Sequence, residues 1–151
     1  MEAFNRLGRP LKIFGDGPEL EYLKSQARPN IEFLGTVSDQ EKAKLFQEAL
    51  AFINPQEEDF GITMVEAMAA GRPVLAYNAG GAKEIVFPGK TGELFAEQTW
   101  EDLADSVIRF KAEDYEPKNI REHALQFDQE KFKKNIKDYV EKEYENFQKN
   151  N

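Results

Sequence analysis

The chain of 151 residues contains no cysteine, one histidine, one tryptophan and no long hydrophobic run. Without cysteine it has neither a disulfide framework nor a thiolate metal site, so a reducing compartment is allowed. No apolar stretch approaches the roughly 20 residues that cross a bilayer, and no signal-peptide pattern follows Met1. We therefore expect no membrane insertion and a cytoplasmic location, with the inner face of the membrane as the alternative for the full-length protein.

Positive charge is also scarce, since 20 Lys and Arg stand against 28 Asp and Glu, for a net charge of −8. Nucleic-acid binding needs a basic footprint, so nucleic acid is not an expected partner. The same deficit disfavours contact with anionic lipid. The single histidine, His123, lies in a polar stretch and is expected to be a solvated surface residue rather than a metal ligand or a base.

Short apolar runs alternate with amphipathic stretches, as in a parallel sheet wrapped by helices. Strands are expected at Leu11–Phe14, Ile31–Leu34, Ala51–Asn54, Pro73–Tyr77 and Glu93–Phe95. Helices are expected at Pro18–Ala27, at Ser38–Ala49, from Thr99 onward and over residues 128–148. With 40% apolar content, residues 1–151 are expected to form one α/β domain, a doubly wound parallel sheet with helices on both faces.

The hydrophobic periodicity predicts which helix faces are buried. The helix at Ser38–Ala49 opens with a capping box, Ser38 to Glu41, which satisfies backbone donors at its start. Its buried face is expected to be Ala43, Phe46 and Ala49 or Leu50. The last helix carries an apolar stripe of Phe132, Ile136, Val140 and Phe147.

The segment EEDFGITMVEAMAAGRPVLAYNAGG, residues 57–81, is the most informative part of the chain. Glu58 precedes a short loop with Gly61, and Glu66 lies inside a helix expected to begin near Ile62. The spacing of eight carries no information by itself, because Glu93 and Glu101 share it. A loop that leads into a helix gathers free backbone N–H groups and the positive end of the helix dipole. The segment therefore predicts an anion site flanked by two carboxylates.

This segment resembles the donor-binding signature of the retaining, GT-B-fold glycosyltransferases of family 4 (group 1), which include many bacterial mannosyltransferases. In that signature two glutamates stand eight positions apart, with Phe-Gly after the first and EAMAxGxPV from the second. The matching residues are Glu58, Phe60, Gly61, Glu66, Ala67, Met68, Gly71, Pro73 and Val74. Further matches are Gly15–Pro18, Phe33–Gly35, Gly80–Gly81 and Thr91–Phe95, so the resemblance covers roughly residues 3–147.

The resemblance implies the C-terminal, Rossmann-like half of a GT-B enzyme, which binds the nucleotide sugar. Ligands of such sheets bind beyond the carboxyl ends of the strands. The loops expected to line that crevice are Gly15–Gly17, Gly35–Val37, Glu57–Thr63 and Gly80–Gly81. Glu66 is implied to accept hydrogen bonds from the ribose hydroxyls. Glu58 is implied to be the catalytic residue, which touches the sugar hydroxyls and stabilises positive charge as the glycosidic bond breaks.

The other implied donor-binding residues act through their backbone. They are Gly15 beside the phosphates, Thr36 and Val37 beside the base, and Phe60, Gly61, Ile62 and Thr63 at the sugar and diphosphate. The side chains of Phe60 and Ile62 fit the hydrophobic core equally well. Gly71 and Pro73 are expected to end the helix and start the next strand. No metal cofactor is implied, because in this family protein cations and amides stabilise the departing diphosphate.

The implied reaction transfers a sugar from a nucleoside-diphosphate sugar to a hydroxyl acceptor, with retention, in polysaccharide or glycoconjugate synthesis. GDP-mannose is the first candidate for the donor. Two alternatives stay open. A dinucleotide-binding oxidoreductase domain would fit Gly15-x-Gly17, although Leu20 stands where its third glycine belongs. A non-catalytic nucleotide-binding module of Rossmann-like fold would fit the same residues without the transfer.

The resemblance also implies that parts of the enzyme precede this chain, because Met1–Asn5 match the middle of a helix in the family. The first strand of the sheet, with an Arg and a Lys that hold the diphosphate, and the N-terminal acceptor domain would be absent. Among basic residues, only Arg72 and Lys83 are near the motif in sequence. We therefore expect the isolated chain to be inactive. We also expect it to close the gap between its open strand edges or to form a homodimer across them.

Overall fold

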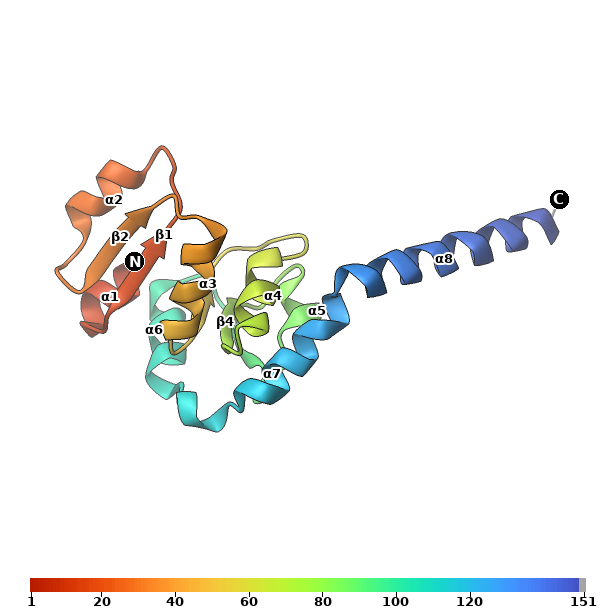
Figure 1. Cartoon of the computed structure of the whole chain (residues 1–151). Coiled ribbons are helices and arrows are strands. Elements are labelled where there is room, and N and C mark those ends of the chain that lie inside the picture. The colour runs from red at the N-terminus through yellow and green to blue at the C-terminus, as the bar shows by residue number, and fades with distance from the viewer. Residues whose placement is uncertain (150–151) are drawn as a thin grey trace.

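All five expected strands are present in the structure, a computed structural model that describes residues 1–149, and each lies within one residue of its expected bounds. The strands are β1 (Leu11–Phe14), β2 (Ile31–Gly35), β3 (Phe52–Asn54), β4 (Val74–Tyr77) and β5 (Gly92–Phe95). The helices are α1 (Glu2–Leu7), α2 (Leu20–Gln26), α3 (Asp39–Glu48), α4 (Ile62–Ala69), α5 (Ala82–Ile85), α6 (Trp100–Arg109), α7 (Pro117–Ala124) and α8 (Gln129–Lys149). Two short 3-10 helices, η1 (Ala112–Asp114) and η2 (Leu125–Phe127), complete the chain (Figure 1).

Every strand pair is parallel, but the strands form two sheets. One sheet pairs β1 with β2, and the other has the order β3-β4-β5. Within the described residues β1 and β3 each have a strand neighbour on one side only, so the gap between them does not close by direct pairing. Side chains bridge it instead, since the rings of Phe14 and Phe52 stack with centroids 6.4 Å apart. The structure thus confirms a parallel, Rossmann-like α/β fold, with a break beside β1.

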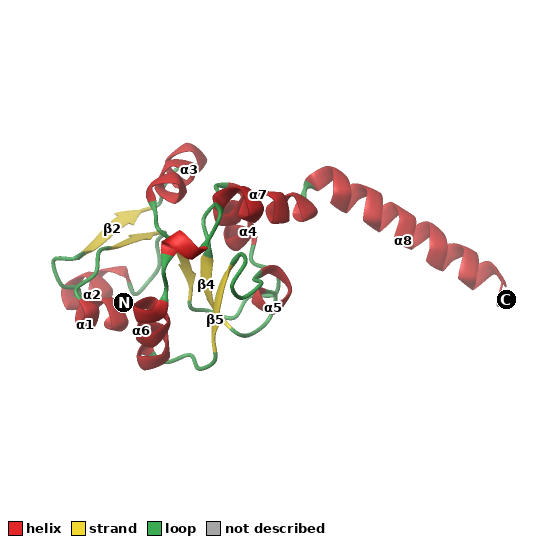
Figure 2. Ribbon diagram, turned by 90° about the horizontal axis from the view of Figure 1, so that it is seen from below, coloured by secondary structure: helices red, strands yellow, loops and turns green. Residues whose placement is uncertain are grey.

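Helices cover both faces of these sheets (Figure 2). On one face, α1 and α6 enclose a core that includes Phe4, Leu75 and Leu103. On the other face, α4 and α7 pack together over a core that includes Met64 and Ile120, both fully buried. The side chain of Asn5 fixes α1 to the segment after α2, because it donates to Gln26 O and accepts from the backbone N–H of Arg28. Within residues 1–149 no strand ladder joins the two sheets, and side chains of both cores pack between them.

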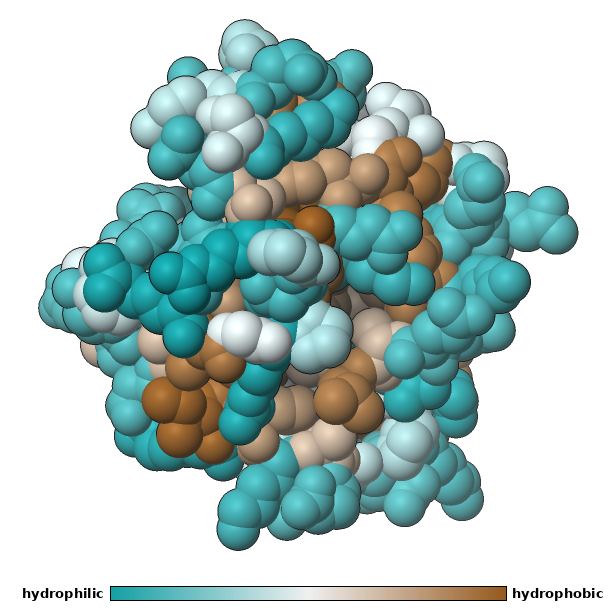
Figure 3. Space-filling model, turned by 90° about the vertical axis from the view of Figure 1, so that its left-hand side faces the viewer, coloured by the Kyte–Doolittle hydropathy of each residue, from teal (hydrophilic) through white to brown (hydrophobic). Residues whose placement is uncertain are grey.

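The β1–β2 sheet is covered less completely than the other. None of the residues in β1 is fully buried and only Ile31 is buried in β2, whereas three of the four residues in β4 are buried. No residue of α2 is buried either. The face where these elements lie accordingly shows apolar surface between hydrophilic side chains (Figure 3).

The expected buried face of α3 is partly wrong. Phe46 is buried, but Ala43 is exposed and Leu50 is 72% exposed. Phe46 points into an aromatic cluster with Phe14 and Phe52, at ring distances of 6.0 and 5.4 Å. Lys42 and Ala43, four and three residues before Phe46, flank it on opposite sides of the helix. The packing of α3 on α4 covers the Lys42 side, so Lys42 is half-buried and Ala43 is exposed. The capping box at Ser38 and Glu41 is confirmed.

The expected long C-terminal helix is confirmed as α8, and it projects away from the sheets (Figures 1 and 2). Its apolar stripe is exposed, with Phe132 at 64%, Ile136 at 47% and Val140 at 56%. Within residues 1–149, no helix combines the length and the apolar content that crossing a bilayer requires.

His123 is not the solvated surface residue that the polar sequence around it predicts. It is half-buried, and its Nε2 lies 2.9 Å from the carbonyl oxygen of Ile85. Its ring packs against Phe87 and Phe127, with centroids 4.9 and 5.7 Å away. The prediction failed because Phe87 and Ile85, the latter 38 positions before His123, meet the ring only in the folded chain.

Candidate functional site

The loop with Glu58 is held in place by the turn after β4. The backbone N–H of Gly81 donates to Glu58 O at 2.8 Å. A Cβ atom built on Gly80 would lie 2.2 Å from Glu58 O, and one built on Gly81 would lie 2.2 Å from Phe60 O. Two glycines are required here because two backbone segments touch. This contact joins two of the four loops that the sequence predicts around one crevice.

Gly61 begins α4 with a left-handed backbone, φ 101° and ψ 54°. Only glycine adopts this conformation without strain, so the residue is needed for the turn itself and not only for access to a ligand. A Cβ atom there would also lie 2.1 Å from the end of the Met64 side chain. Neither Ile62 nor Thr63 donates its backbone N–H to an acceptor within the described residues. Two free donors therefore stand at the positive end of α4, an arrangement that suits an anion.

The turns after β1 and β2 form a second pair of joined loops. Gly15 has φ 109°, and its backbone N–H donates to Gly35 O at 2.7 Å. Thr36 is exposed and Val37 is half-buried, directly before the N-cap Ser38 of α3. Within residues 1–149 no hydrogen bond connects this pair of loops to the Glu58 loop. The four loops thus form two pairs, and α3 begins directly after the second pair.

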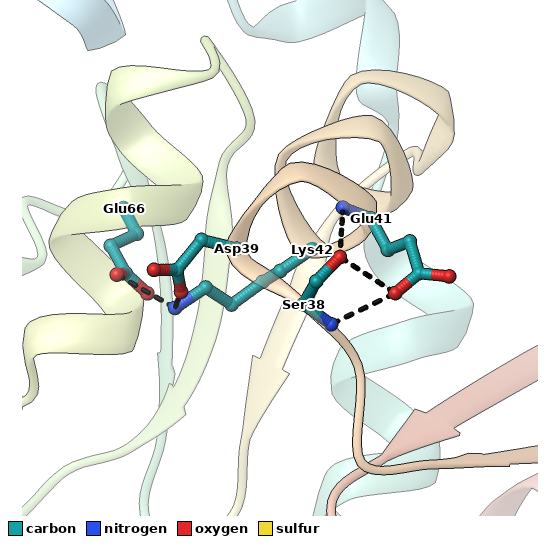
Figure 4. Close-up of polar contacts among 5 residues, drawn as sticks. All are labelled: Ser38, Asp39, Glu41, Lys42 and Glu66. Atoms are coloured by element: carbon teal, nitrogen blue, oxygen red, sulfur yellow. Dashed lines mark hydrogen bonds and ion pairs between the residues drawn. The ribbon is translucent and has the colours of Figure 1, made fainter.

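Lys42 of α3 connects the two halves of the candidate site, because its ammonium group bonds to Glu66 of α4 (Figure 4). Its Nζ lies 2.8 Å from Glu66 Oε1 and 3.3 Å from Asp39 Oδ1. The hydrogen bond to Glu66 is the largest cause that raises the pKa of Lys42 above its ordinary value. Lys42 is thus firmly a cation at neutral pH, and Glu66 is held at one of its two oxygens.

Lys42 was missed in the sequence, where only Arg72 and Lys83 lie near the motif. It stands 24 positions before Glu66, and only the packing of α3 on α4 brings the two together. One signal could have found it. Lys42 lies four residues before Phe46, on the same face of a helix whose start is marked by a capping box. Arg72 contacts Gln47 O instead, away from Glu66.

Glu58, the expected catalytic residue, is half-buried in its loop. Its carboxylate accepts a hydrogen bond from the side chain of Gln56. One of its oxygens would lie 3.7 Å from a Cβ atom built on Gly61, so the carboxylate sits next to the start of α4. Glu58, Gly61, Ile62, Thr63 and Glu66 are therefore grouped around the first two turns of one helix.

The side chains of Phe60 and Ile62 are not core residues, since they are 47% and 66% exposed. The Phe60 ring contacts Phe127 of η2, with centroids 5.8 Å apart. The far end of α4 is closed as expected. Gly71 has φ 78°, and the backbone N–H groups of Gly71 and Arg72 bond back to Met68 O and Ala67 O.

Across the described part of the chain, no three or more His, Cys, Asp or Glu side chains gather in a way that could hold a metal ion. A hollow of about 190 Å³ lies elsewhere, between the start of α1, the end of β5 and the start of α6. None of the expected donor-binding residues lines it.

The chain is similar in sequence to known glycosyltransferases. The sequence pattern of the family described as glycosyl transferases group 1 matches residues 2–127. The phosphatidyl-myo-inositol mannosyltransferase of Mycobacterium leprae is 38% identical over 113 residues, 72% of this chain and 29% of that protein. The alpha-1,3/1,6-mannosyltransferase ALG2 of Rhizomucor pusillus is 36% identical over 125 residues, 81% of this chain and 27% of that protein.

A similar fold occurs in the solved structure of Anabaena Alr3699/HepE in complex with UDP-glucose. Its TM-score is 0.69 at 26% identity, over 88% of this chain and 41% of that one. This chain spans less than a third of the length of the two curated relatives described above, at 29% and 27%. The family match covers most of the described chain, including both loop pairs and α4. The chain therefore belongs to the glycosyl transferases group 1 family.

Proposed function

We propose that this chain is the donor-binding part of a retaining glycosyltransferase that transfers a sugar from a nucleoside-diphosphate sugar to a hydroxyl acceptor. The observation that carries the proposal is the start of α4. There a left-handed glycine, two free backbone N–H groups and the carboxylates of Glu58 and Glu66 lie within two helical turns. Amides at a helix start suit a diphosphate, and a carboxylate suits a vicinal diol.

In this proposal each group has one task. Glu66 accepts hydrogen bonds from the ribose hydroxyls, while the amides of Phe60, Gly61, Ile62 and Thr63 face the sugar and diphosphate. Gly15 lets the backbone approach the phosphates, and the backbone of Thr36 and Val37 lies beside the base. Glu58 touches the donor sugar and stabilises positive charge as the glycosidic bond breaks. No metal or other cofactor has a part in this scheme.

We further propose GDP-mannose as the donor and polysaccharide or glycoconjugate synthesis as the setting. Two of the relatives described above are mannosyltransferases by name, which supports mannose. The structural relative with bound UDP-glucose supports only the general class of ligand, a nucleotide sugar.

The acceptor site is proposed to lie in an N-terminal domain outside this chain. The full-length protein is proposed to be located in the cytoplasm or at the inner face of the membrane. The break beside β1 leaves strand edges at β1 and β3 that a further strand could fill. For the chain as it stands, pairing of two copies across these edges would give a homodimer. Sedimentation velocity of the purified chain distinguishes monomer from dimer.

The test of the proposed function is nucleotide binding by wild type and Glu66→Ala. Wild type should be stabilised in a thermal-shift screen by one of GDP, UDP and ADP, since a ligand of the folded state raises its melting temperature. Loss of the charge-assisted bonds to ribose should weaken binding by about 1.5–3 kcal/mol, which is roughly ten- to a hundredfold.

Glu101→Ala and Glu130→Ala are matched controls. Glu101 follows Glu93 by eight positions and Glu130 follows Glu122 by eight, but both pairs lie far from α4 in sequence. Both variants should bind like wild type. Equal affinities of wild type and Glu66→Ala would remove Glu66 from the site. A preference for NADH, with a spectral change, would revive the oxidoreductase alternative.

A further inference from the structure

We infer that Lys42 is a positioning residue of the donor site, which holds Glu66 so that its free oxygen receives a ribose hydroxyl. This inference rests on the proposed function, because it assumes that Glu66 meets ribose. The direct observation is the ion pair of 2.8 Å between Lys42 Nζ and Glu66 Oε1 (Figure 4).

The backbone that carries Lys42 is well fixed. Lys42 lies in the first turns of α3, where the backbone N–H of Glu41 donates to Ser38 Oγ at 3.2 Å and that of Ser38 donates to the Glu41 carboxylate at 2.9 Å. Phe46, one turn later, is buried in the aromatic cluster. The Lys42 side chain is only 22% exposed, and Asp39 Oδ1 lies 3.3 Å from its ammonium group. The cation therefore has a defined place from which to hold Glu66.

Glu66 is held on one side only. Its Oε1 meets Lys42, whereas Oε2 accepts no hydrogen bond from residues 1–149. Its side chain is 36% exposed, so the free oxygen is accessible to a ligand. A carboxylate fixed at one oxygen loses less side-chain freedom when a hydroxyl binds the other. Lys42 thus prepares Glu66 for the diol and need not touch the nucleotide itself.

In the opposite role, Lys42 would compete with ribose for the Glu66 carboxylate, and the ion pair would have to break before ribose binds. The free Oε2 argues against it, because a hydroxyl can bind Glu66 while the ion pair stays intact. Asp39, on the same helix, is a second partner of the Lys42 ammonium group at 3.3 Å.

The test measures nucleotide affinity for wild type, Lys42→Met, Lys42→Arg, Glu66→Ala and the double variant Lys42→Met/Glu66→Ala. The probes are GDP, UDP and ADP and their 2′,3′-dideoxy forms, titrated into the full chain and followed by NMR, which also measures weak binding. Lys44→Met is the matched control. Lys44 lies on the same helix, is 75% exposed and pairs only loosely with Glu48 at 3.9 Å.

We expect Lys42→Met to weaken binding of the ribose form about three- to tenfold, in the lower part of the range of coupling between two groups of one network. The dideoxy form should change little, Lys42→Arg should retain most of the affinity, and Lys44→Met should match wild type. In the Glu66→Ala background, Lys42→Met should have no further effect. This pattern separates positioning of Glu66 from a general loss of structure, which would weaken both forms equally.

Equal losses for ribose and dideoxy forms, tighter binding by Lys42→Met, or no change while Glu66→Ala weakens binding would each overturn the inference and leave the proposed function standing. If wild type bound none of the three diphosphates, the proposed function would fail and the inference would fail with it.

Discussion

Replacement of Gly81 by alanine tests whether the contact between the β4 turn and the Glu58 loop supports the candidate site. Gly81 has φ −62° and ψ −21°, a conformation that alanine adopts readily, so only the added Cβ atom matters. That atom would lie 2.2 Å from Phe60 O, 2.7 Å from Phe60 Cα and 2.8 Å from Asp59 O. All three are backbone atoms, which cannot turn aside as the end of a flexible side chain can.

The size of the effect follows from these distances. Non-bonded carbon contacts relax at about 3.5 Å, so the loop must move by roughly 1 Å. Forcing extra volume into a packed site costs about 1–3 kcal/mol. The hydrogen bond of 2.8 Å from Gly81 to Glu58 O weakens as part of that change. At about 4 °C per kcal/mol for a domain of this size, the melting temperature should fall by about 4–12 °C.

The measurement is thermal and urea denaturation followed by circular dichroism, together with the nucleotide titration. Gly17→Ala is the matched control, because a Cβ atom on Gly17 meets nothing within 4 Å and its φ is not left-handed. Gly17→Ala should melt within a degree or so of wild type or slightly above it. Gly81→Ala should also weaken nucleotide binding, since the amides at the start of α4 move with the loop.

The reasoning would be refuted if Gly81→Ala matched Gly17→Ala in stability and wild type in affinity. Lower stability with unchanged affinity would have a narrower meaning: the contact stabilises the fold, but the Glu58 loop is not part of the nucleotide site.

Two further predictions concern the bridge between the sheets and the activity of the chain. Phe46→Ala should lower the free energy of unfolding by about 3–5 kcal/mol, measured by urea denaturation, because it empties the aromatic cluster that joins β1 to β3; the exposed control Ala43→Ser should change it little. The purified 151-residue chain should transfer no sugar from a labelled nucleoside-diphosphate sugar, because the acceptor site is proposed to lie in a separate N-terminal domain. Measurable transfer or rapid donor hydrolysis would contradict that proposal.

Much of the fold follows from local sequence. Alternating apolar runs predict all five strands, and the Ser38–Glu41 capping box predicts the start of α3. Gly61 and Gly71 mark the two ends of α4, because their left-handed backbone is one that other residues rarely adopt. The grouping of Glu58 and Glu66 around that helix follows as well, since both lie within a few residues of its start. These features depend on neighbours along the chain, so one sequence is enough to predict them.

The tertiary structure decided what depends on distant segments. It separated the strands into two sheets, turned Ala43 outward, buried one side of His123 and gave Lys42 its partner Glu66, 24 positions away. Helical periodicity predicts that one face of α3 is buried. Because Ala43 and Lys42 are adjacent, periodicity allows either of them at the border of that face. The position of Phe14 and Phe52 determines where Phe46 points, and that rotation of α3 brings Lys42 to Glu66. Which of Lys42 and Ala43 borders the buried face depends on how segments far apart in sequence pack, and a local pattern does not predict that packing.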